Sequence, residues 1–153
     1  MKFTDGFWQL RPGVTALYAQ EAYDIWPTVR SADGPGLVIT APTAVIAKRG
    51  DVLNRAALTV TLSSPLEGVV RVRIAHHEGG SWHGGFELPG AVAGAGVADA
   101  SAGTLTTGAL TARVSPGAPW ALSFEVDGSP VPASGRKSQA YLRLSPDAAV
   151  DHG

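Results

Sequence analysis

Residues able to bind a metal ion or a sugar are concentrated in one short stretch of the chain. It reads His76-His77-Glu78-Gly79-Gly80-Ser81-Trp82-His83-Gly84-Gly85-Phe86. An aromatic face can stack on a sugar ring while polar neighbours hydrogen-bond its hydroxyls, so Trp82 and His83 are the candidate carbohydrate contacts. The histidine spacing matches no standard zinc signature, and adjacent His76 and His77 would point to opposite faces of a strand. We therefore expect no metal site, and favour an interdomain or solvated loop over direct carbohydrate contact.

The remaining polar residues do not form a catalytic pattern. All eight aspartates stand beside turn or loop signals, where a carboxylate commonly accepts hydrogen bonds from nearby backbone amides. The absence of cysteine excludes a thiolate nucleophile, and no glycine-rich fingerprint precedes a convincing helix. We assign no catalytic residue and expect no cofactor.

Other residues also have a binding interpretation beside a structural one. Trp8, Trp26 and Trp120 are possible sugar platforms, but Trp120 continues an apolar stripe with Leu122 and Phe124, which favours the core. Three arginines occupy polar faces of predicted strands, where they can pair across strands or meet another domain: Arg71, Arg73 and Arg113.

Composition limits the class of protein. The chain has 153 residues, of which 44% are hydrophobic, enough for one domain with its own core. A net charge of -1 with dispersed arginines argues against a nucleic-acid partner. The first residues lack the apolar run of a secretory signal, and no stretch approaches the roughly 20 apolar residues of a membrane helix. We expect a cytoplasmic protein with no membrane partner.

Two hairpins follow from apolar alternation with a period of two. Leu58, Val60 and Leu62 alternate with threonines, and after a turn predicted over residues 63–68 the alternation resumes from Val70 to Ile74. Similar patterns run through residues 110–114 and 120–126. Asp127-Gly128 then predicts a tight turn, and Pro130 indicates a short or edge strand.

Weaker strand patterns cover residues 7–10, part of 14–26, 37–40, 92–97, 105–107 and 141–144. The segment 15–24 also has a composition compatible with a helix, and its apolar spacing is ambiguous. Residues 90–103, mostly alanine, glycine and valine, are interpreted as a strand with loose ends. Many short strands separated by turns predict an all-β, antiparallel β-sandwich over residues 1–144, with residues 145–153 beginning a connector.

Three blocks of the sequence are similar to a known family. They are Phe3-Thr4-Asp5-Gly6-Phe7-Trp8 with Arg11-Pro12-Gly13-Val14 and Tyr23-Asp24, then the stretch 64–76 around Val70-Arg71-Val72-Arg73-Ile74, and the stretch 110–128. Their order and spacing resemble the N-terminal domain of family 31 glycoside hydrolases, and of α-xylosidases in particular. Ala140-Tyr141 departs from the Gly-Tyr that relatives tend to have.

The resemblance implies a galactose-mutarotase-like sandwich that is noncatalytic. Its partner would be the catalytic (β/α)8 barrel of the same parent chain, a fold of about 250 residues. Two carboxylates of that barrel, about 5 Å apart, would perform the retaining hydrolysis, and no position here matches either of them. The domain would pack on the barrel and shape its substrate entrance.

Two other functions remain open at the level of sequence. A free-standing carbohydrate-binding or protein-interaction sandwich would need no further domain and could use the Trp82 loop directly. An aldose epimerase would need a positioned acid and base in a complete groove, for which the chain is short. A docking face left uncovered would also permit weak self-association, near the Trp82 loop or residues 141–144.

Overall fold

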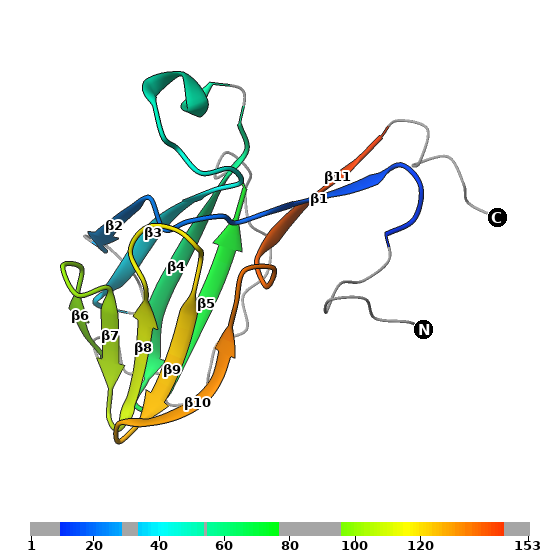
Figure 1. The fold of residues 1–153 in the computed structure, drawn as a ribbon. Helices are drawn as coiled ribbons and strands as arrows, with labels where there is room; N and C mark the ends of the chain where they lie inside the picture. Colours follow the sequence, from blue (N-terminus) through cyan, green and yellow to red (C-terminus); the bar gives the residue numbers. More distant parts are fainter. Residues whose placement is uncertain (1–9, 29–33, 54, 77–95, 146–153) are drawn as a thin grey trace.

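The structure is a computed structural model that describes residues 10–28, 34–53, 55–76 and 96–145. Within these ranges the regular elements are eleven strands and one short 3-10 helix (Figure 1). In chain order they are β1 (Val14–Tyr18), β2 (Asp24–Pro27), β3 (Gly36–Pro42), η1 (Arg49–Val52), β4 (Ala57–Leu66), β5 (Val69–Ala75), β6 (Val97–Asp99), β7 (Thr104–Thr107), β8 (Leu110–Val114), β9 (Leu122–Val126), β10 (Ser129–Ser134) and β11 (Ala140–Leu144). No helix in the described ranges is long and apolar enough to cross a membrane.

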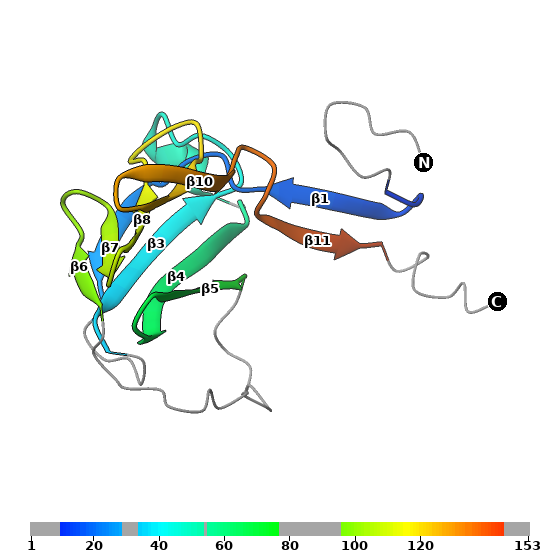
Figure 2. The same cartoon turned by 90° about the horizontal axis from the view of Figure 1, so that it is seen from below.

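Two antiparallel sheets pack face to face and confirm the predicted β-sandwich (Figures 1 and 2). One has the strand order β2-β3-β4-β5 and the other has the order β10-β9-β8-β7-β6. Alternate residues of both sheets point inward and form one buried cluster: Leu37, Ile39, Ala41, Leu58, Val60, Leu62, Leu105, Ala112, Val114 and Leu122, with Ala19, Ala22 and Trp120. The core therefore arises from the period of two that each inner strand carries.

The first predicted hairpin is confirmed, but its turn is shorter than expected. β4 and β5 pair with Val60 opposite Ile74 and Leu62 opposite Val72. The prediction of a turn over residues 63–68 was wrong, because β4 continues to Leu66 through an irregularity in its register. Ser64 is buried there and hydrogen-bonds the Thr107 hydroxyl of the opposite sheet. This contact with a residue far along the chain overrides the local preference of serine and proline for turns.

The second predicted hairpin is also confirmed. β8 pairs with β9, and Asp127 and Gly128 both have positive φ, 49° and 75°, in the turn to β10. Such a turn matches the twist of the strands that it connects. β10 lies at the sheet edge, as Pro130 indicated. Trp120 is completely buried, although it precedes β9, which begins at Leu122.

The weaker patterns have mixed outcomes. Strands are confirmed at residues 37–40, 105–107 and 141–144, and the segment compatible with a helix contains β1 and the start of β2 instead. The prediction of a strand through residues 90–103 was wrong over its last part, because β6 ends at Asp99 and residues 100–103 form a turn. Asp99 stabilises this turn by accepting hydrogen bonds from Ser101 and the Ala102 amide. Residues 7–9 and 92–95 lie outside the described ranges.

β1 and β11 form a separate two-stranded antiparallel ribbon, which we call the arm. It extends away from the sandwich in both views (Figures 1 and 2). At its base Ala19 donates a backbone hydrogen bond to Gln139, and at its tip Ser145 donates one to Gly13. The arm thus joins the two ends of the described chain outside the main core.

Candidate binding surfaces

The predicted carbohydrate contacts Trp82 and His83 lie outside the described residues, as does most of the histidine-rich stretch. The first member of that stretch, His76, follows β5 and stacks on Tyr141 of the arm, with ring centroids 3.9 Å apart. Its Nδ1 lies 3.3 Å from the carbonyl oxygen of Ala57. His76, directly after β5, therefore contacts both the base of the arm and the start of β4. Within the described residues, no three histidine or acidic side chains are grouped as metal ligands would be.

The two faces of the arm differ in chemistry. Directly paired residues share a face of a ribbon, so Val14 with Leu144 and Ala16 with Leu142 form an apolar face. The opposite face carries Thr15 with Arg143 and Leu17 with Tyr141. Leu142 and Leu144 keep 54% and 59% of their surface exposed. An isolated pair of strands is marginally stable in water, so this apolar face is suited to contact with another surface.

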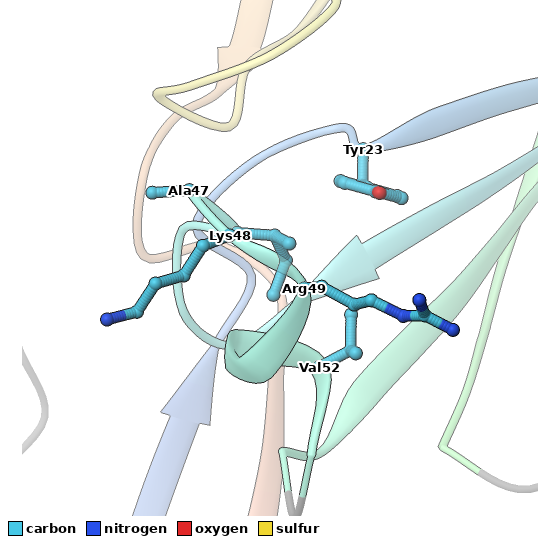
Figure 3. A pocket seen from close by; sticks show the side chains of 6 residues that line it. Tyr23, Ala47, Lys48, Arg49 and Val52 are labelled. Atoms are coloured by element: carbon cyan, nitrogen blue, oxygen red, sulfur yellow. The ribbon is translucent and has the colours of Figure 1, made fainter.

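A second surface is a depression where the chain enters β2. Its volume is about 370 Å³, and it is lined by Tyr23, Ile46, Ala47, Lys48, Arg49 and Val52 (Figure 3). The lining comes from two segments, the residue preceding β2 and the loop from Pro42 to Ala57 that contains η1. Figure 3 shows Arg49 and Lys48 extending in opposite directions from the loop, with Tyr23 across the depression from η1.

Buried and half-buried carboxylates hold this loop in place. Glu21 is buried, and its Oε1 accepts a 2.7 Å hydrogen bond from the Ile46 amide. Asp51 Oδ2 accepts hydrogen bonds from the amides of Ala47 and Lys48 at 3.1 and 3.0 Å. Both carboxylates are thus directed at the loop backbone. The loop is tied to β2's entry segment and to itself, which positions the side chains of η1.

The other singled-out residues divide between core and surface. Trp120 is a core residue, as favoured, whereas Trp26 on β2 is 57% exposed and Trp8 lies outside the described ranges. Arg73 and Arg113 are exposed, and Arg71 is half-buried. Sequence reasoning missed the Tyr23 depression. The sequence does contain two adjacent cations, Lys48 and Arg49, between the apolar residues Val45 and Val52. No pattern of neighbouring residues, however, predicts that Tyr23 lies opposite them.

Comparison with known proteins shows a partial sequence relationship to an α-xylosidase. No protein-family model matches the chain. A 78-residue region, 51% of the chain, is 36% identical to part of the α-xylosidase XylQ of Lactiplantibacillus pentosus. Half of this chain is related in sequence to part of an α-xylosidase. The match covers 10% of XylQ, so this chain spans only a small part of the length of that relative.

Proposed function

We propose that this chain is a noncatalytic, N-terminal domain of a family 31 glycoside hydrolase, α-xylosidase-like or α-glucosidase-like. The observation that carries the proposal is the 36% identity to an α-xylosidase. The matched region is half of this β-sheet chain and one tenth of the α-xylosidase. The reaction would belong to a catalytic barrel elsewhere in the parent protein, where two carboxylates act on the glycosidic bond. This domain would pack on the barrel and shape its entrance.

The arm supports this role because its apolar face is available for docking. Burying a leucine side chain fully is worth about 1.5–3 kcal/mol. Since Leu142 and Leu144 are each about half exposed, covering the remainder would contribute about 1 kcal/mol per residue. The position of β11 next to the last described residue, Ser145, would place this face beside any domain that follows.

The coding sequence beyond Gly153 provides the first test. A following barrel that carries the paired carboxylates of a retaining glycosidase would support the proposal. A coding sequence that contains no such barrel would contradict it, and would favour a free-standing carbohydrate-binding or protein-interaction module.

Substitution in the parent protein tests the docking surface. We expect the double variant Leu142→Glu/Leu144→Glu to expose the junction between the domains to limited proteolysis and to lower the thermal stability of the parent enzyme. Val97→Glu is the matched control, because Val97 is also an exposed apolar residue, at 74%, but lies on β6 of the five-stranded sheet and not on the arm. Equal proteolysis of the double variant and the control would exclude the arm as the docking surface.

A free-standing module remains the second candidate because the same apolar face could join two copies of the chain. In that case light scattering would show a dimer of the natural chain, and Leu142→Glu/Leu144→Glu would return it to a monomer. Saturable glycan binding by the natural chain would also favour this candidate.

A further inference from the structure

The depression beside Tyr23 combines an aromatic surface with apolar side chains. Tyr23 keeps 48% of its surface exposed, although it directly follows the buried residue Ala22. Its backbone is fixed because its amide donates a 2.9 Å hydrogen bond to the Thr40 carbonyl of β3. Ile46, Ala47 and Val52 supply the apolar remainder of the lining. Tyrosine offers both an apolar face and a polar hydroxyl, as the alternating CH and OH groups of a sugar ring require.

The charges of the lining side chains indicate which chemical class of ligand the depression would bind. Two of the six lining residues, Lys48 and Arg49, are cations, and none of the six is acidic. Ammonium and guanidinium groups only donate hydrogen bonds, and a guanidinium matches the two oxygens of a carboxylate. The nearby carboxylates Glu21 and Asp51 already accept hydrogen bonds from the loop backbone. Lys48 and Arg49 extend in opposite directions (Figure 3), so the Arg49 side of the depression is suited to a ligand with one anionic, acceptor-rich group.

The loop is also held before any ligand arrives. The amides of Ile46, Ala47 and Lys48 are each bound to a carboxylate, and the Thr43 hydroxyl donates a 2.8 Å hydrogen bond to the Ala56 carbonyl. A binding surface that is already ordered loses less conformational entropy when it binds. Figure 3 shows η1 and Tyr23 facing each other across the depression from these fixed segments.

We propose that the Tyr23 depression is a binding site for an acidic saccharide, in which a uronic acid ring stacks on Tyr23 and its carboxylate pairs with Arg49. The choice of a saccharide over an acidic peptide rests on the proposed function, while the preference for an anion rests on the lining alone. A volume of about 370 Å³ accommodates a single sugar ring with open access to its neighbours in an oligosaccharide. Its six lining residues do not include the predicted contacts Trp82 and His83, which lie outside the described residues.

The test is calorimetric titration of the full chain with a xylose oligosaccharide that carries a glucuronic acid branch. The same oligosaccharide without the branch is the neutral comparison, and an oligoglutamate peptide is the competing class. We expect binding of the acidic oligosaccharide to be at least about tenfold tighter than binding of the neutral one, and to weaken as salt is added. Equal affinity for the two oligosaccharides, tighter binding of the peptide, or no binding of any probe would overturn the inference.

Matched substitutions locate the site. We expect Arg49→Gln to lower the affinity for the acidic oligosaccharide about tenfold and to remove its advantage over the neutral one. Tyr23→Ala should lower the affinity of the chain for both oligosaccharides. The controls are Arg113→Gln, an exposed arginine on β8, and Val97→Ala, an exposed apolar residue on β6, neither of which lines the depression. Binding lost equally in the controls, or retained in Arg49→Gln, would refute this placement.

The binding site and the proposed function can be refuted independently of each other. A barrel encoded beyond Gly153 together with a depression that does not bind would refute only this site. A depression that binds, in a chain followed by no barrel, would refute only the assignment to a glycosidase.

Discussion

Replacing Thr107 with valine tests how the two sheets of the sandwich are joined. Thr107 lies on β7 and is 1% exposed, and its hydroxyl oxygen accepts hydrogen bonds from the Ser64 hydroxyl at 2.8 Å and from the Gly68 amide at 3.1 Å. Ser64 belongs to β4 of the other sheet, and Gly68 to the turn that follows β4. This one hydroxyl therefore connects the five-stranded sheet to the irregular end of β4.

The magnitude follows from the hydrogen bonds that each change removes. Valine has nearly the shape of threonine but can neither accept nor donate a hydrogen bond. The two bonds that Thr107 accepts are worth about 1 kcal/mol each, and its contact with the Leu66 carbonyl, at 3.5 Å, is long for a hydrogen bond and adds little. We expect Thr107→Val to lower the free energy of unfolding by about 2 kcal/mol. Ser64→Ala should lower it by about 1 kcal/mol, because the single hydroxyl proton of Ser64 is shared between Thr107 and the Leu66 carbonyl, 3.0 Å away.

Urea unfolding followed by tryptophan fluorescence measures these differences, since Trp120 is completely buried in the folded chain. Thr104→Val is the control, because Thr104 lies on the same strand and is only half-buried; we expect a change within about 0.5 kcal/mol. The slope of unfolding free energy against urea should not change. Equal losses in Thr107→Val and Thr104→Val would refute the reasoning.

Three further outcomes are expected. The purified chain should not hydrolyse aryl α-xylosides or α-glucosides, and turnover abolished by one acidic substitution would contradict this. Calorimetry should detect no submicromolar zinc site, whereas a site lost in His76→Ala or His83→Ala would reverse that expectation. Hydrogen bonds from the Ser101 side chain and then from the Ala102 amide hold the pKa of Asp99 below its ordinary value of 3.8. The folding stability that these bonds contribute is present at a pH above that ordinary value, and it is lost as the pH falls through the lowered pKa. Titration of the carboxyl by NMR should show this lowered pKa, and Ser101→Ala should raise it; an unchanged midpoint would exclude the serine as its cause.

Much of the sandwich could be predicted from the sequence because its signals are local. The alternation through Leu58–Leu62 and Leu110–Val114 depends only on residues two positions apart, and each strand formed where that period was found. The Asp127-Gly128 turn needs only two residues that tolerate positive φ. The burial of Trp120 followed in the same way from the apolar stripe that it begins.

The tertiary structure decided what depends on residues far apart in the chain. The end of β4 is a strand because Ser64 meets Thr107, 43 residues later. The segment from Thr15 had no local preference between helix and strand, and its backbone becomes a strand by pairing with β11 at the other end of the chain. The Tyr23 depression likewise needs β2's entry segment beside the loop around η1. Periodicity in a sequence determines which face of a strand is apolar, but only the packed chain determines which distant residues meet on that face, because those contacts depend on the position of every strand between them.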